Sequence, residues 1–109
     1  MSDSESNYSQ VFSFDTNITY ADNAIVSKKI ITNKGGNVTL FSFDKDQALS
    51  EHSAPFDALV QVLEGSAEII INKEVFQLEK GQSIVMPANI THALRAIEKF
   101  KMLLTMVKN

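Results

Sequence analysis

Short runs of β-branched and aromatic residues, separated by turn residues about every ten positions, constrain the fold of this chain most. No stretch shows a sustained helical period. Because β-branched and aromatic side chains fit a pleated, half-buried surface, this spacing is typical of a β-sandwich or barrel. The expected strands cover residues 11–14, 25–32, 37–43, 59–64, 67–71, 74–78, 83–86, 92–97 and 100–107.

Turn-forming residues separate these runs at the positions where hairpins are expected. Residues 33–36 (Asn-Lys-Gly-Gly) and 72–73 (Asn-Lys) contain types that adopt positive φ at low cost, so both are predicted hairpin turns. Gly65 and Gly81 are expected to end strands in the same way.

The N-terminal residues 1–10 differ in composition from the rest of the chain. They read MSDSESNYSQ, which is acidic and serine-rich with little to bury, so we expect a flexible tail there. The remaining residues 11–109 are few enough for one domain and numerous enough to bury a core. We therefore expect a single all-β domain after a short tail.

Charge and cysteine content exclude several classes of function. The formal net charge is −3, and basic residues form no patch with aromatics, so neither nucleic acid nor an anionic membrane is an expected partner. With no cysteine, the chain has no disulfide, thiolate ligand or cysteine nucleophile. The N-terminus lacks a secretory signal and no apolar run approaches about 20 residues, which predicts a cytoplasmic protein.

Alternation along residues 92–97 predicts which side chains face the interior. If His92 points inward, Leu94 and Ala96 point inward with it, and Arg95 points outward. This division places the charge in solvent and the apolar side chains in the core, so an inward His92 is expected.

Two other runs are apolar on both faces, namely residues 59–63 and 100–107. A strand with two apolar faces needs cover on both sides. Because such a surface left in water is an association site, we expect a homodimer.

The only two histidines stand in runs with defined spacing. Gly81 is followed by five residues, then by Pro87 and, after it, by His92. The run EHSAPFDALVQVLEG carries His52 and ends on Gly65. Together these runs resemble the two motifs of the cupin family, and the resemblance spans roughly residues 37–107.

The resemblance implies an all-β double-stranded β-helix, or jelly-roll barrel, with a site at its mouth. Typical cupins offer three histidines and one glutamate to a metal ion, and His52 and His92 match two of these four positions. Ala54 stands where the second histidine is expected, and Ala58 where the glutamate is expected. We expect the two imidazoles to lie close enough to share one ligand.

These residues indicate either a divalent metal site or a metal-free pocket. Neutral imidazoles suit zinc, nickel, iron or manganese, so His52 and His92 are the candidate metal ligands. Asp57, one residue before the vacant glutamate position, is the third candidate if the strand begins with a bulge, although strict alternation turns it away from the side that Ala58 faces. Without a metal, the two histidines are hydrogen-bonding groups of the pocket.

Apolar residues near the histidines predict the walls of this pocket. Pro55 restricts the chain, so Phe56 is expected to form an apolar lip, with Met86 as an adaptable wall opposite and Leu94 facing the same interior. The alternative is that Phe56 and Met86 are ordinary core residues.

Three classes of function are compatible with this sequence. The first is a small-molecule-binding cupin that acts as a sensor or accessory protein, favoured by the missing ligand side chains. The second is a metal-dependent enzyme of the oxidoreductase, dioxygenase or isomerase type, favoured by both histidines in register. The third is a structural dimerisation module whose pocket is filled by side chains.

Overall fold

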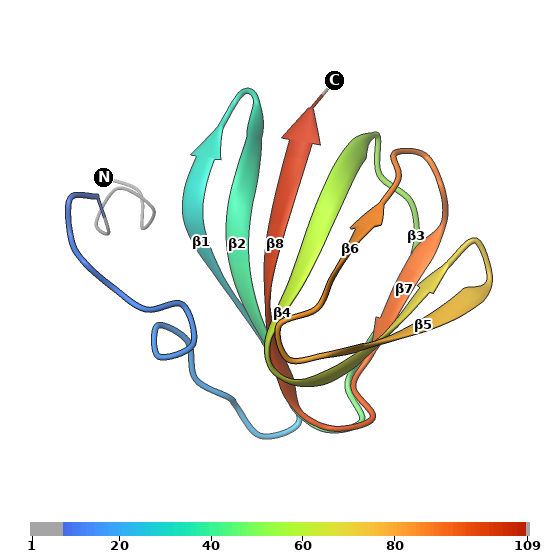
Figure 1. Cartoon of the computed structure of the whole chain (residues 1–109), viewed down its shortest axis with the longest axis horizontal. Helices are drawn as coiled ribbons and strands as arrows, with labels where there is room; N and C mark the ends of the chain where they lie inside the picture. The colour runs from blue at the N-terminus through green and yellow to red at the C-terminus, as the bar shows by residue number, and fades with distance from the viewer. Residues whose placement is uncertain (1–7, 109) are drawn as a thin grey trace.

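The computed structural model describes residues 8–108 and shows eight antiparallel strands with no helix in that range (Figure 1). Residues 1–7 of the expected tail lie outside the described residues. In the part of the chain described, no helix is long and apolar enough to cross a membrane. The strands are β1 (Ile25–Asn33), β2 (Gly36–Phe43), β3 (Ala48–His52), β4 (Phe56–Ile71), β5 (Glu74–Glu79), β6 (Ser83–Met86), β7 (His92–Arg95) and β8 (Phe100–Lys108).

The strands form two sheets that share β4. The first sheet has the order β1-β2-β8-β4-β6, and the second has the order β3-β7-β4-β5. The first part of β4 pairs with β6 and β8, and its last part pairs with β5 and β7. The curled shape in Figure 1 follows from this sharing. The predicted all-β jelly-roll barrel is confirmed.

Gly65 allows β4 to serve both sheets. From its sequence, this glycine was expected to end a strand, but β4 runs through it as one strand of 16 residues. The backbone there has a φ of 74°, and a Cβ atom would collide with the carbonyl oxygen of Lys99. The pairing with β8 also shifts by one residue between Val62 and Glu64. This bulge changes the alternation, so both parts of β4 face the same interior.

The main core lies between the two sheets. Phe43 of β2 and Phe100 of β8 stack there with ring centroids 4.5 Å apart. The buried side chains of β4 also face this interior, and they are Ala58, Val60, Val62, Ala67 and Ile69. Burial of these apolar side chains is the main contribution to folding free energy.

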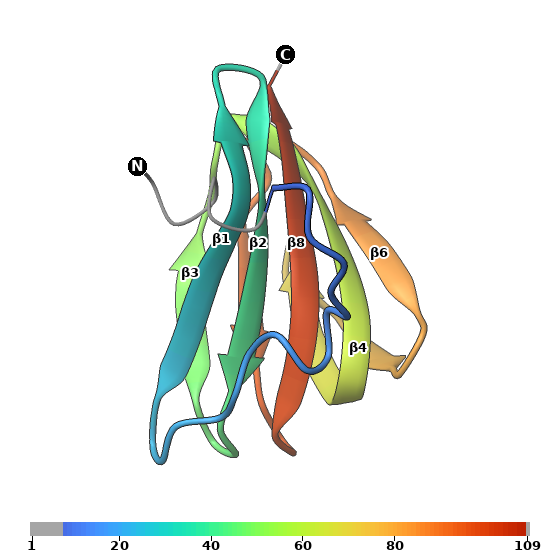
Figure 2. The same ribbon diagram turned by 90° about the vertical axis from the view of Figure 1, so that its left-hand side faces the viewer.

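A second apolar cluster covers the outer face of the first sheet. Residues 15–20, here called the strap, cross this face over β2, β8 and β4 (Figure 2). Ile18 of the strap packs against Leu40 and Leu103, which are buried. The strand predicted over residues 11–14 is wrong, because the segment lies outside every strand pair.

Polar contacts fix the strap to three neighbouring strands. The Ser42 hydroxyl donates to the carbonyl of Thr19 at 2.9 Å, and the Lys101 Nζ donates to the carbonyl of Asp15 at 2.5 Å. The Tyr20 hydroxyl donates to Glu64 Oε2 at 2.5 Å. Burial and the Glu64 carboxylate both raise the pKa of Tyr20, so it remains a donor at neutral pH. The strap thus covers part of the apolar outer face that we expected a second subunit to cover.

The sequence predicts the two hairpin turns but not strand β3. The hairpin turns are confirmed, since Asn33 pairs with Gly36 and the residues of the second turn, Asn72 and Lys73, both have positive φ. Strand β3 was not predicted, because its sequence ALSEH is mostly polar and exposed. An edge strand of this kind gives no hydrophobic signal, and only pairing with β7 defines it.

We expect Gly65→Ala to lower the free energy of unfolding by more than about 2 kcal/mol. The left-handed φ costs roughly 1–2 kcal/mol, and the collision with Lys99 adds to it. Gly81→Ala is the matched control, because Gly81 has a φ of 87° but its Cβ would meet nothing within 4 Å. Urea unfolding of the two variants measures the difference. Equal losses in the two variants would contradict the tight approach at Gly65.

Candidate functional site

The structure brings the two histidines together at the rim of the barrel. The Nε2 atoms of His52 and His92 lie 3.1 Å apart, and the rings meet edge to face with centroids separated by 4.4 Å. His92 is buried and His52 is exposed. The pair therefore lies where the interior of the barrel meets solvent.

Pairing between strands explains this proximity. His52 is the last residue of β3, His92 is the first residue of β7, and the two are direct partners after an irregularity in the register. On its other side, His92 pairs with Ile71 at the end of β4. Strand β7 thus holds His92 between His52 of β3 and Ile71 of β4. The sheet, rather than the local sequence, brings together the two histidines that are 40 residues apart in the chain.

The predicted alternation around His92 is confirmed. His92, Leu94 and Ala96 are buried, with 6%, 2% and 1% of their surface exposed, whereas Arg95 is exposed. An inward imidazole above two apolar side chains has few polar partners. Its hydrogen bonds therefore decide its chemistry.

Backbone carbonyls hold both imidazoles in the same tautomer. His52 Nδ1 lies 2.7 Å from the carbonyl oxygen of Ser50, and His92 Nδ1 lies 3.3 Å from that of Ile90. Because a carbonyl only accepts, each Nδ1 carries the proton and donates it. With both Nδ1 atoms protonated and both rings neutral, the two Nε2 atoms, 3.1 Å apart, are both acceptors, whereas a proton on either Nε2 forms a hydrogen bond between the rings. This arrangement needs a proton, a hydrogen-bond donor or a cation between the two atoms.

The protonation of His92 is disfavoured. Burial lowers the pKa of His92, and the neighbouring His52 lowers it further, while the hydrogen bond to Ile90 acts in the opposite direction. A neutral imidazole is therefore the favoured form of His92 at neutral pH. A neutral Nε2 is also the form that binds metals.

The histidine pair fits part of a metal site. Two nitrogens that each lie about 2.0–2.1 Å from one ion are separated by no more than about 4.2 Å, and the observed 3.1 Å is within that limit. Donation of Nδ1–H to a carbonyl is the usual support of a metal-binding imidazole. Among residues 8–108, however, no group of three or more His, Cys, Asp or Glu side chains could hold an ion. The described part of the chain therefore offers two ligands at this position.

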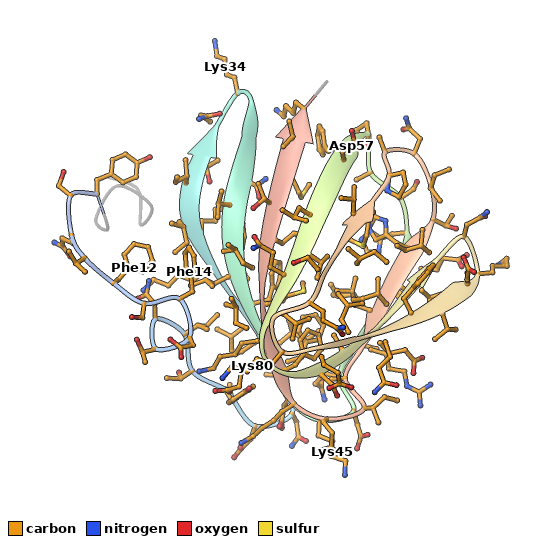
Figure 3. The ribbon with its side chains drawn as sticks, in the orientation of Figure 1. Phe12, Phe14, Lys34, Lys45, Asp57 and Lys80 are labelled. Carbon is orange, nitrogen blue, oxygen red and sulfur yellow. The ribbon has the colours of Figure 1, made fainter. Side chains whose placement is uncertain are left out.

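Asp57 is not brought to the histidines. Its carboxylate accepts a hydrogen bond from the backbone N–H of Ala88 at 2.9 Å, and the residue is exposed. Ala58, next to it, is buried, as alternation requires. Figure 3 shows Asp57 at the open end of β4. The irregularity of β4 lies beyond Val62 rather than at the start of the strand, so nothing turns this carboxylate inward.

The three expected pocket residues lie at different depths. Met86 and Leu94 belong to the main core, each with 2% of its surface exposed. Phe56 is half-buried, and Lys108 Nζ lies 5.6 Å from its ring centroid. The carbonyls of Ser50 and Ile90, which orient the imidazoles, were not predicted from the sequence. Each precedes its histidine by two residues, a shared spacing that has meaning only once the strands are paired.

Comparison with known proteins identifies the family. The family model for the cupin domain matches residues 39–108. This chain belongs to the cupin family. The match begins within β2 and ends with β8, so it includes both histidines and the whole of β4.

Solved structures resemble this cupin over most of its length. A conserved protein of unknown function from Streptococcus pyogenes is 39% identical, with a TM-score of 0.89, 94% of this chain covered and 90% of that chain. A cupin 2 conserved barrel domain protein from Leptotrichia buccalis is 41% identical, with a TM-score of 0.84, 86% of this chain covered and 46% of that chain. A cupin superfamily protein from Desulfitobacterium hafniense is 26% identical, with a TM-score of 0.83 and 86% of each chain covered. No curated protein matches this cupin.

We expect His92 of the metal-free protein to titrate below about 6.5, the usual value for histidine. The unfolded chain then binds this proton more readily than the folded chain. The contribution of neutral His92 to the free energy of unfolding is therefore fully present above a pH of about 6.5, and it is lost as the pH falls through the folded-state pKa. NMR titration of the imidazole signals, with urea unfolding between about pH 5 and 8, measures both effects.

The variant His52→Gln separates the two causes of this shift. It removes the neighbouring positive charge but leaves His92 buried, so the midpoint of His92 should rise yet stay below the usual value. A wild-type midpoint at or above the usual value, or no response to His52→Gln, would contradict the coupling of the pair.

Proposed function

We propose that this cupin binds a small molecule at the barrel rim and acts as a sensor or accessory protein. The observation that supports the proposal is the close approach of the Nε2 atoms of His52 and His92, separated by 3.1 Å at the rim of the barrel. Each imidazole is oriented by a carbonyl, so the pair is preorganised to bind one donor or cation that lies above both nitrogens.

The surroundings of the pair define the chemistry of such a ligand. Both nitrogens accept, so the ligand presents O–H or N–H donors, or a cation that it coordinates. The buried side of the site carries Leu94, whereas His52 faces solvent. A compact molecule with a donor-bearing polar end and an apolar end therefore fits the rim best.

Metal-dependent catalysis is the second candidate. The support for it is the donation of both Nδ1–H groups to carbonyls, as in metal-binding imidazoles. His52 and His92 would hold zinc, nickel, iron or manganese, with the other positions left to water and substrate. When bound, the ion would act as a Lewis acid in oxidoreductase, dioxygenase or isomerase chemistry. His52 and His92 would position the ion, and through it the substrate.

We expect tag-free protein that binds metal to lose it when either histidine is removed. His52→Ala and His92→Ala each leave one imidazole, which is too few ligands to retain a first-row ion against water. Asp57→Ala is the matched control and should retain binding, because the Asp57 carboxylate bonds to Ala88 instead. Titration with Zn²⁺, Ni²⁺, Fe²⁺ and Mn²⁺ followed by calorimetry measures the affinities. Stoichiometric metal in the double histidine variant would contradict both candidate functions at this site.

For metal-free protein, we expect small alcohols, phenols and amides to perturb the NMR signals of His52 and His92. Each histidine changed to alanine should weaken binding by about 0.5–1.5 kcal/mol, the usual loss of one hydrogen bond. Asp57→Ala again serves as the control and should leave the affinity unchanged. Ligands whose affinity is indifferent to both histidine changes would show that recognition occurs elsewhere.

A further inference from the structure

Polar side chains stand on the inner face of the first sheet where β1 pairs with β2. Asn37 and Thr39 share this face with Phe41, which packs against the main core, whereas Leu40 belongs to the outer cluster. Lys29 of β1 is the direct partner of Thr39 and therefore lies on the same face. We call Lys29, Asn37 and Thr39 the polar corner.

The hydroxyl of Thr39 fixes the carboxamide of Asn37. Thr39 is buried, and its hydroxyl donates to Asn37 Oδ1 at 3.1 Å. The Nδ2 group of Asn37 meets Met106 Sδ at 4.0 Å, and a thioether is only a weak acceptor. A carboxamide has two N–H donors, so Asn37 keeps donor capacity for a ligand, and the exposed Lys29 adds a positive charge on the same face. The polar corner therefore suits a negatively charged acceptor such as a carboxylate.

The polar corner lies toward the same end of the barrel as the histidine pair, but on the other sheet. Asn37 is in one row with Ala58 of β4 through β8, and His92 is in one row with Ile71 of β4. Ala58 precedes Gly65 by seven residues and Ile71 follows it by six, so both rows lie at similar distances from the point where β4 changes sheets. Figure 1 shows the two sheets spreading apart toward the open end, where β2 and β7 begin.

The strand order places the polar corner and His52 on facing strands. Strands β2 and β3 are each second from β4 in their own sheet, after β8 and β7 respectively. Apolar side chains lie on the inner faces between the two polar groups, with Met106 on the first sheet and Leu94 on the second. A ligand at the open end that contacts both sheets therefore has a polar group at each end and an apolar part between them.

We propose that the ligand of this cupin is a hydroxycarboxylate, whose hydroxyl binds the histidine pair and whose carboxylate binds the polar corner. The inference rests on the proposed function, because the hydroxyl uses the same Nε2 atoms. Asn37 donates to the carboxylate, Thr39 positions Asn37, and Lys29 attracts the negative charge. Asn37 is thus the residue that selects an acid over the alcohol of the same length.

Three matched probes separate the two ends of the ligand. An ω-hydroxy acid carries both groups, the alcohol of the same length lacks the carboxylate, and the unsubstituted acid lacks the hydroxyl. A series of ω-hydroxy acids from glycolate to hydroxyoctanoate finds the length that spans the two sheets. Calorimetry and NMR titration of the metal-free full chain measure the dissociation constants. At that length, the hydroxy acid should bind at least about tenfold more tightly than the alcohol or the unsubstituted acid.

Variants of the polar corner identify the residues that bind the carboxylate. Asn37→Ala should weaken binding of the hydroxy acid about tenfold and leave the alcohol unchanged, which also shows that the barrel remains folded. Lys29→Gln should weaken it by about two- to fivefold at low salt and less at high salt, because Lys29 is exposed. Lys45→Gln is the matched control, since it removes the same charge at the opposite end of the barrel (Figure 3) and should have no effect.

The same titrations distinguish failure of this inference from failure of the proposed function. His52→Ala should weaken binding of the hydroxy acid and the alcohol but not of the unsubstituted acid. If Asn37→Ala binds the hydroxy acid as the wild type does, the polar corner is not a binding site, and a loss in His52→Ala alone would still support the proposed function. If His52→Ala affects none of the probes, the proposed function is wrong, and with it the hydroxyl end of the ligand. A series in which no hydroxy acid binds more tightly than its alcohol would overturn the hydroxycarboxylate.

Discussion

The sharing of β4 between two sheets is the constraint on which the rest of this structure depends. A single strand of 16 residues must leave one sheet and enter the other while keeping its apolar side chains on the same side. The positive φ of Gly65 and the one-residue irregularity near Val62 achieve this. Without them, the alternation would turn either Val60 or Ile69 outward, and both are fully buried.

The same strand positions the candidate site. The last residues of β4 pair with β7, so the pairing of Ile71 with His92 fixes the position of His92 along the barrel. His92 pairs in turn with His52 at the end of β3 and so fixes the position of His52. The histidine pair is therefore a consequence of sheet register. Its chemistry depends on two carbonyls that can accept hydrogen bonds from the Nδ1 atoms and so direct the Nε2 atoms toward each other. This orientation favours a donor, a proton or a cation as the group that completes the site.

The strap has a different role, which is to make a two-faced sheet stable in one chain. Apolar side chains on the outer face, such as Leu40 and Leu103, would expose a large patch without it. Tyr20 and Lys101 fix the strap through polar contacts to the sheet and to the backbone. Outside the strap, Ile31 and Val85 remain 41% and 55% exposed.

Local sequence by itself determined most of the strands, the two tight hairpins and the inward direction of His92. These features depend on residues that are neighbours along the chain, through turn chemistry and the period of two. The spacing of Gly81, Pro87 and His92, together with the run from His52 to Gly65, also indicated the family that the comparisons show. Only the tertiary structure decided that β3 exists, that residues 11–14 form no strand, and that Asp57 bonds to Ala88 instead of joining the histidines. Each of these features depends on partners that are remote in the sequence. Those partners determine the hydrogen bonds and the burial of a side chain, whereas the strand propensity of the residue itself does not.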